Sequence, residues 1–152
     1  MNRLAYEVGG LLASAGAVVI TGGKDGVMEA AARGAREQGG VTVGVVKGSR
    51  RSVSNRYTDI EVLTGMAADG LDELLLVLMS DAVIAIGGGA GTLQEIALAY
   101  RNSKPIIALA SSGGWAQRLE GQYVDDRKRA RVLPASQPDD AVRKALAGLR
   151  KP

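Results

Sequence analysis

The segment IGGGAGTLQE (86–95) combines exposed main chain with one carboxylate, and it is the clearest candidate for chemistry in this sequence. It follows an apolar run and opens a helical pattern, so it should join a strand to a helix. Glycine allows a positive φ and lets a ligand approach the backbone. Amides exposed at a helix start favour an anion, most simply a phosphate. The residues predicted to bind a phosphate or nucleotide here are Gly87, Gly88, Gly89, Gly91 and Thr92.

A second glycine loop, TGGKDGVMEA (21–30), has the same setting between a strand and a helix. Its predicted phosphate- or nucleotide-binding residues are Gly22, Gly23 and Gly26. In open parallel sheets, ligands bind beyond the carboxyl ends of the strands, which is where both loops should lie. Neither loop matches a Walker sequence or the usual dinucleotide spacing. An alternative without any ligand therefore stays open, in which the glycines serve only tight strand-to-helix packing.

Glu95 follows the later loop by one helical turn and is the predicted catalytic residue. Its carboxylate would face the sugar of a ligand whose phosphate lies on the loop. The alternative is an acid that interacts with the helix dipole, which contributes only about 0.3–1 kcal/mol. Glu29 follows the earlier loop in the same way, and it too could be an acid that only interacts with the helix dipole.

Composition limits the chemistry that the chain can perform. The 152 residues suffice for one domain, spanning 1–152, and are too few for two. The chain has no cysteine and no histidine, so disulfides, thiolate sites and the commonest metal ligand and general base are excluded, and no metal site is predicted. No segment resembles a signal peptide or a membrane span, so we expect a cytoplasmic protein without a membrane partner.

The net charge of +3 and the sequence pI of about 9.4 raise the question of nucleic-acid binding. Basic residues gather in 50–56 and 127–131, with acids close by. Aromatic residues make up only 3% of the chain, so platforms for base stacking are scarce. Nucleic acid is not expected as a partner, and these arginines are read as solvated surface charges.

The elements that must position these loops alternate between helix and strand. Periodicity predicts helices over 2–15, 25–38, 71–80, 91–102 and about 138–150, and strands over 17–21, 41–46, 59–64, 82–86, 106–110 and 131–135. Short apolar strands alternating with helices indicate a parallel sheet covered on both faces. The predicted class is therefore α/β: a doubly wound, mostly parallel sheet in a Rossmann-like three-layer sandwich.

The start of the chain departs from this plan. Residues 2–15 read as a helix, whereas such folds normally begin with a strand at the centre of the sheet. Two explanations stay open: the chain lacks the usual first strand, or its start is truncated.

Several motifs resemble one superfamily. TGGKDGVMEAAARGA, DAVIAIGGGAGTLQEIALA and KPIIAL resemble the lysine-decarboxylase-like Rossmann proteins. That group includes the LOG-type nucleoside monophosphate phosphoribohydrolases, which activate cytokinins, and the molybdenum-cofactor carrier proteins. SGGWAQRLEG and ASQPDDAVRKAL are most similar to the bacterial proteins related to the carriers. The resemblance covers nearly the whole chain.

The resemblance implies roles for individual residues. Gly88, Gly89, Gly91 and Thr92 would hold a 5′-phosphate, and Glu95 would contact the ribose and serve N-glycosidic cleavage. Gly87 stands where LOG-type enzymes have proline. The carrier-like relatives also have glycine at this position. The implied ligand is a molybdenum cofactor or a nucleotide. The implied assembly is a homo-oligomer, a dimer or tetramer, in which the apolar segment 71–80 would form an interface; core burial explains that segment equally well.

One departure bears on catalysis. LOG-type enzymes carry a catalytic arginine near the start of the helix before the loop strand, where this chain has Asp72 and Glu73. A carboxylate cannot clamp a phosphate or stabilise a departing base as arginine does. Arg50, Arg51 or Arg56 would have to replace it. Three functions stay open: a binder of a phosphorylated small molecule, a nucleoside 5′-monophosphate phosphoribohydrolase, and an assembly module without a ligand.

Overall fold

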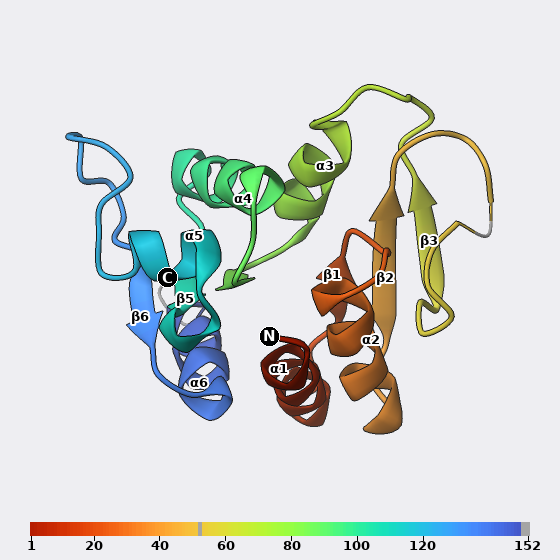
Figure 1. Cartoon of the computed structure of the whole chain (residues 1–152), viewed down its shortest axis with the longest axis horizontal. Coiled ribbons are helices and arrows are strands. Elements are labelled where there is room, and N and C mark those ends of the chain that lie inside the picture. The colour runs from red at the N-terminus through yellow and green to blue at the C-terminus, as the bar shows by residue number, and fades with distance from the viewer. Residues whose placement is uncertain (52, 150–152) are drawn as a thin grey trace. The chain divides into compact units, whose positions relative to one another are not determined.

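The computed structural model describes residues 1–51 and 53–149 (Figure 1). The chain forms two compact units, an N-terminal unit, Met1–Leu76, and a C-terminal unit, Val77–Pro152. Each unit contains one parallel three-stranded sheet with helices packed against it. A single domain over 1–152 stays a prediction.

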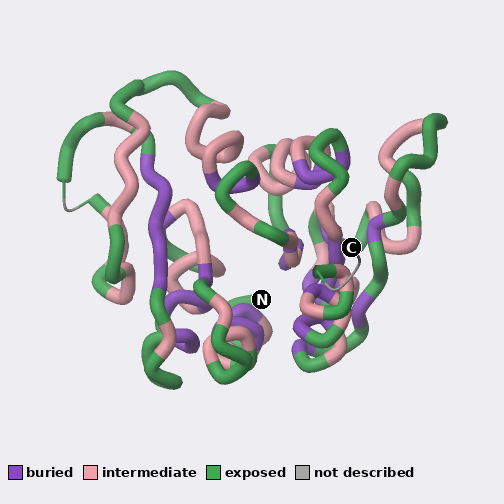
Figure 2. Tube along the Cα trace, turned by 180° about the vertical axis from the view of Figure 1, so that it is seen from behind, coloured by how far each residue is buried: buried purple, intermediate pink, exposed green. Residues whose placement is uncertain are grey.

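The N-terminal unit is built on the strand order β1-β2-β3. Its elements are α1 (Asn2–Ser14), β1 (Val19–Thr21), α2 (Val27–Glu37), β2 (Thr42–Val46), β3 (Ile60–Leu63) and the start of α3 (Leu71–Met79). The central strand β2 is buried along its whole length (Figure 2). This burial explains why its sequence is a continuous run of small and apolar residues rather than an alternating one.

Two glycines bring α1 and α2 into close contact. A Cβ atom at Gly9 would lie 2.0 Å from the carbonyl oxygen of Ala31, and one at Gly34 would lie 2.0 Å from that of Tyr6. The helices therefore cross backbone against backbone, and each glycine makes room for the other helix. No larger residue fits at either position without separating the helices.

The C-terminal unit has the strand order β4-β5-β6. Its elements are β4 (Val83–Ile86), α4 (Ala90–Arg101), β5 (Ile106–Leu109), the 3₁₀ turn η1 (Ala110–Ser112), α5 (Gly114–Leu119), β6 (Leu133–Ala135) and α6 (Pro138–Gly148). The central strand β5 is fully buried. Pro138 opens α6 with Asp139 and Asp140 in its first turn, an arrangement that suits a helix N-terminus.

The predicted strands and helices all form, and both sheets are parallel, so the Rossmann-like α/β class is confirmed. Two elements were not predicted: η1 and α5 lie in a segment that reads as a glycine-rich turn. They are too short to show helical periodicity. None of the helices in residues 1–51 and 53–149 combines the length and apolar character needed to cross a membrane.

The apolar helix α3 is only partly a core helix. Leu76 and Val77 are buried, but Leu78 is 48% exposed and Met79 is 46% exposed. Core burial, one of the two explanations for the apolar segment 71–80, therefore does not hold at its C-terminal end. The helix is apolar on every side, so it cannot bury all of its hydrophobic side chains against one neighbour.

Candidate functional site

The later glycine loop makes a sharp turn between β4 and α4. Gly87 has a φ of 60° and Gly88 a φ of 94°, a region that residues with a side chain rarely adopt. Gly89 then precedes the first residue of α4, with a φ of −103° that other residues can adopt. The glycine run is therefore required by backbone geometry at its first two positions.

The carbonyl side of this loop is held by the short helix α5. The amide of Trp115 donates to the carbonyl of Gly88 (3.2 Å), and the amide of Ala116 donates to that of Gly87 (3.0 Å). A Cβ atom at Gly114 would lie 2.6 Å from both the carbonyl carbon of Gly87 and the carbonyl oxygen of Gly88. The two segments thus pack main chain on main chain, and the loop is fixed in one conformation.

Ser112 secures the start of the same turn. It is buried, and its Oγ accepts a hydrogen bond from the amide of Gly87 (2.6 Å) while donating to the carbonyl of Leu109. Sequence reasoning missed this residue and Gly114. The signal that could have found them is the run SSGG directly after the apolar strand β5, since small residues there allow a second loop to approach the first.

The opposite side of the loop is open. A Cβ atom at Gly89 would meet nothing within 4 Å, whereas one at Gly88 would lie 2.1 Å from Oγ1 of Thr92, so the threonine side chain lies against the loop. Gly91 lies in the first turn of α4, and half-buried Glu95, which interacts with neighbouring groups, lies one turn further along. The structure thus gathers the predicted residues 87–89, 91, 92 and 95 around the start of one helix.

The earlier loop belongs to the N-terminal unit and is tied down within it. Gly23 is buried; its amide donates to Oγ1 of Thr21 (3.1 Å), and its carbonyl accepts from the amide of Asn55 (2.6 Å). A Cβ atom at Gly23 would lie 2.9 Å from Cγ1 of Val46, so close packing explains this glycine. At Gly22, such an atom would lie 2.9 Å from the sulfur of Met28.

Gly26 is the open position of this earlier loop. It has a φ of 70°, nothing lies within 4 Å of the place where its Cβ would be, and it is the N-cap residue of α2. Glu29 lies in the first turn of that helix. Among the predicted glycines, Gly88 and Gly89 of the later loop are exposed, while Gly87 is buried; of the three in the earlier loop, Gly26 is exposed.

The acids that replace the expected arginine lie in the first turn of α3. Burial, and next a hydrogen bond with Asp72, raise the pKa of Glu73. Lys47 forms an ion pair with Asp69, and its hydrogen bond to that carboxylate raises the pKa of Lys47, with smaller contributions from Asp72 and Glu73. Lys47 is therefore already paired with Asp69, and α3 itself offers no arginine for a phosphate.

The three arginines suggested as replacements also lie in the N-terminal unit. Arg50 and Arg51 are exposed, and Arg56 donates to the hydroxyl of Tyr57 (2.7 Å). In the C-terminal unit, the guanidinium group of Arg118 on α5 lies 5.1 Å from the ring centre of Trp115.

Within the described part of the chain, no group of three or more acidic, histidine or cysteine side chains could hold a metal ion.

Known proteins resemble this chain over most of its length. A phosphoribohydrolase from Mycobacterium tuberculosis, named for cytokinin riboside 5′-monophosphate, is 30% identical over 93% of this chain and 83% of its own. The molybdenum cofactor binding protein of Rippkaea orientalis superposes with a TM-score of 0.82 and 34% identity, covering 96% of this chain and 86% of that one. The molybdenum cofactor carrier protein of Chlamydomonas reinhardtii superposes with a TM-score of 0.80 and 31% identity, covering 99% and 88%. Residues 1–142 match the sequence model of the SLOG cluster4 family, and the chain belongs to that family.

Proposed function

We propose that this chain binds a phosphorylated small molecule, a nucleotide or a molybdenum cofactor, at the loop 87–92 of its C-terminal unit. The observation that carries this proposal is the asymmetry of the loop. The carbonyls of Gly87 and Gly88 are turned toward α5 and bonded there, while the side at Gly89 is open. A ligand would therefore meet the amides that follow Gly87 rather than carbonyl oxygens, since the amide of Gly87 already donates to Ser112.

The start of α4 suits a phosphate. The amides of a first helical turn have no partner within their own helix, and the helix dipole makes this end positive. No side chain caps α4, and its first turn contains no acid that would take the place of a bound anion. Thr92, with its side chain against the loop, adds a hydroxyl donor.

A molybdenum cofactor would be cargo rather than a resident group. Its phosphate would lie on the amides of the loop, and the open side at Gly89 would leave room for its organic part. The relatives from Rippkaea and Chlamydomonas, named for binding or carrying this cofactor, support this choice of ligand. A cytoplasmic location, expected because no segment resembles a signal peptide or a membrane span, is part of the same proposal.

A second function, hydrolysis of a nucleoside 5′-monophosphate, is supported by Glu95. Its position one turn beyond Thr92 matches the register expected for a carboxylate beside the sugar, and the mycobacterial relative is named for this reaction. Water would form a bond to C1 of the ribose as the bond from C1 to the base breaks, and the base would leave with a proton. Glu95 would stabilise the positive charge that develops on the ribosyl group.

Incubation with AMP and other nucleoside monophosphates should distinguish the two functions. If the chain is a hydrolase, chromatography detects free base and ribose 5-phosphate, and Glu95→Ala lowers the rate by a factor on the order of 100 or more, since an electrostatic contact made in the transition state is lost. Asp139→Ala, a change at an exposed acid in the first turn of α6, is the matched control and should leave the rate unchanged. Undiminished release by Glu95→Ala would exclude the role of Glu95 in hydrolysis; binding without release that is weakened by Gly89→Asp would favour the carrier-like function.

We also propose that the chain forms a dimer or tetramer through the exposed end of α3. Burying a leucine or methionine side chain contributes about 1.5–3 kcal/mol, so Leu78 and Met79 would add substantially to an interface. Sedimentation velocity should show an oligomer for the wild-type chain and a monomer for a variant that combines Leu78→Lys with Met79→Lys. Val41→Lys is the control, because Val41 is similarly exposed, at 46%, but lies elsewhere. A wild-type chain that sediments as a monomer would contradict the proposal.

A further inference from the structure

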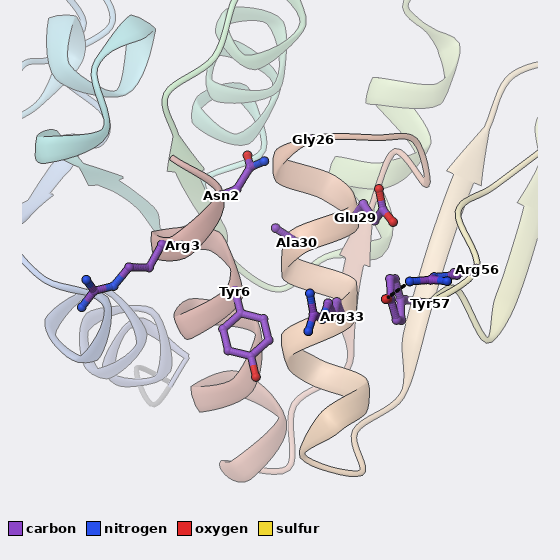
Figure 3. A pocket seen from close by; sticks show the side chains of 9 residues that line it. All are labelled: Asn2, Arg3, Tyr6, Gly26, Glu29, Ala30, Arg33, Arg56 and Tyr57. Atoms are coloured by element: carbon purple, nitrogen blue, oxygen red, sulfur yellow. Dashed lines mark hydrogen bonds between the residues drawn. The ribbon is translucent and has the colours of Figure 1, made fainter.

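A cavity of about 490 Å³ lies in the N-terminal unit (Figure 3). We call it the arginine groove; it lies between the first turns of α1 and α2 and the segment before β3. The residues that matter for its chemistry are Tyr6, Gly26, Glu29, Arg33, Arg56 and Tyr57. Its volume falls in the range of about 300–1,000 Å³ that small-molecule sites occupy.

Two arginines in the groove are stacked on two tyrosines. The guanidinium carbon of Arg33 lies 5.7 Å from the ring centre of Tyr6, and that of Arg56 lies 4.8 Å from the ring centre of Tyr57. Figure 3 shows Arg33 projecting from α2 between Tyr6 and the Arg56–Tyr57 pair. The groove thus contains two of the four tyrosines in a chain that has few aromatic residues. Such stacking holds the guanidinium planes in place.

These two arginines retain most of their hydrogen-bonding capacity. Arg33 forms an ion pair with Glu37, to which its Nε donates (2.8 Å), and Arg56 donates through Nη2 to the phenol of Tyr57 (2.7 Å). No other hydrogen bond of either guanidinium group is formed among the residues that the structure describes. Because the contact of Arg56 is to a neutral group, its charge remains available to an anion. Arg3, at the rim, points away and pairs with Glu7.

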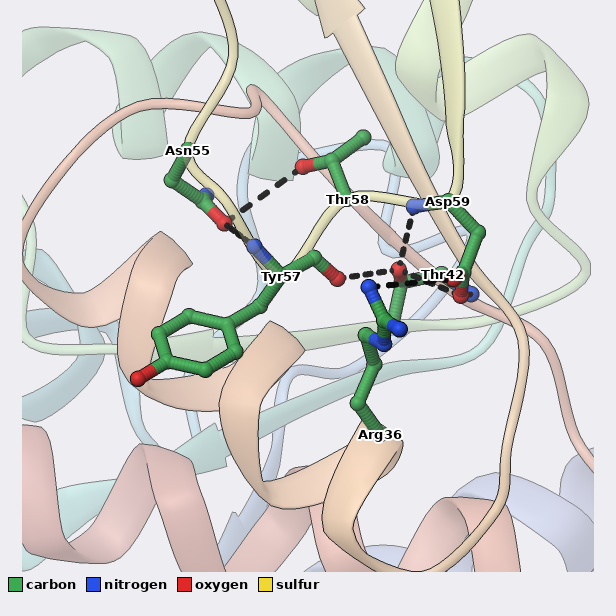
Figure 4. Close-up of polar contacts among 6 residues, drawn as sticks. All are labelled: Arg36, Thr42, Asn55, Tyr57, Thr58 and Asp59. Atoms are coloured by element: carbon green, nitrogen blue, oxygen red, sulfur yellow. Dashed lines mark hydrogen bonds and ion pairs between the residues drawn. The ribbon is translucent and has the colours of Figure 1, made fainter.

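The segment that carries Arg56 and Tyr57 is anchored to buried Thr42 at the start of β2 (Figure 4). Oγ1 of Thr42 donates to the carbonyl of Tyr57 (2.6 Å) and accepts from the amide of Asp59 (2.9 Å), while the amide of Thr42 donates to Oδ2 of Asp59 (2.9 Å). Oδ1 of Asn55 accepts from the amide of Tyr57 (3.0 Å). The groove wall is therefore preorganised, which lowers the entropy cost of binding.

The remaining walls define the shape and polarity of a ligand. Gly26 leaves open space at the start of α2, and Glu29 lies one turn before Arg33 on the same helix. Two guanidinium groups suit a phosphate, the tyrosine faces suit a flat ring, and a carboxylate suits hydroxyl donors. An inorganic anion would satisfy only the first of these features.

We infer that the arginine groove binds a nucleoside monophosphate: the phosphate between Arg33 and Arg56, the base against a tyrosine ring face opposite its guanidinium group, and the ribose hydroxyls toward Glu29. The groove shares none of its residues with the loop 87–92, and the inference does not depend on the function proposed for that loop. A chain with both sites would bind two phosphorylated ligands, one in each unit.

Calorimetry with AMP on the full chain tests this inference in a Gly89→Asp background, where the loop 87–92 is blocked. We expect one AMP to bind per chain, and adding Arg33→Gln or Arg56→Gln to weaken binding about tenfold or more, since each removes a charge-assisted contact. Arg101→Gln, a change at an exposed arginine on α4, is the matched control and should have no effect. Adenosine and ribose 5-phosphate should each bind less tightly than AMP.

Three results would overturn the inference. The first is no binding of AMP to Gly89→Asp, which would leave the loop 87–92 as the site of any binding seen with the wild-type chain. The second is AMP affinity that is unchanged by both arginine variants. The third is ribose 5-phosphate binding as tightly as AMP, which would exclude a role for the base. Circular dichroism of each variant confirms that it is folded, and these exposed arginines are not required for packing.

Discussion

Gly89→Asp is expected to weaken binding of a phosphorylated ligand at the loop 87–92 strongly while the chain stays folded. The new side chain would enter open space, and the φ of −103° suits residues other than glycine. As the N-cap residue of α4, aspartate would accept hydrogen bonds from the same first-turn amides that a phosphate needs. Its charge would also repel the phosphate. We expect affinity to fall by a factor on the order of 100, equivalent to about 2.7 kcal/mol.

Gly89→Asn is the matched control for this prediction. Asparagine has the same shape and also caps helices, but it carries no charge. Binding measured by calorimetry should therefore weaken less in Gly89→Asn than in Gly89→Asp, and thermal unfolding should show both variants at least as stable as the wild-type chain. Wild-type affinity in Gly89→Asp would show that no phosphate lies at the start of α4.

Gly9→Ala is expected to destabilise the protein by about 2–3 kcal/mol, the cost of forcing an extra methyl group into a packed contact. The methyl group would lie 2.0 Å from the carbonyl oxygen of Ala31, which belongs to the backbone of α2 and cannot rotate away. The helices would have to separate, and this would also displace Tyr6 of the arginine groove. The free energy of unfolding, measured in urea by circular dichroism, should fall although alanine favours helices by about 1 kcal/mol over glycine.

The neighbouring residue provides the control. A Cβ atom at Gly10 would lie 3.4 Å from Cγ of Gln38 and from the carbonyl oxygen of Gly34, which is an ordinary contact. Gly10→Ala should therefore be neutral or stabilise the protein by up to about 1 kcal/mol through helix propensity. Equal unfolding free energies for Gly9→Ala and Gly10→Ala would contradict the close helix crossing. Gly34→Ala should resemble Gly9→Ala, because it meets the carbonyl of Tyr6 at 2.0 Å.

The sequence by itself determined the elements and the place of the later loop. Continuous apolar runs mark β2 and β5 because both strands are central and buried on each face. The positions of Gly87 and Gly88 after a strand indicated a turn that other residues rarely adopt, and both have positive φ. These features are local, since periodicity and backbone conformation depend on residues that lie close together in the chain.

Only the tertiary structure decided which of these elements contact one another and through which residues. Ser112 and Gly114 hold a loop that precedes them by some 25 residues, and no spacing in the sequence indicates that contact. In the sequence, Gly9 and Gly34 are residues of low helix propensity within two helices. The structure shows that the helices cross at these two glycines. Likewise, Arg56 and Tyr57 join Arg33 because Thr42 anchors their segment beside α2. Contacts of this kind depend on how the chain returns to itself, which is set by packing across the fold rather than by any local pattern.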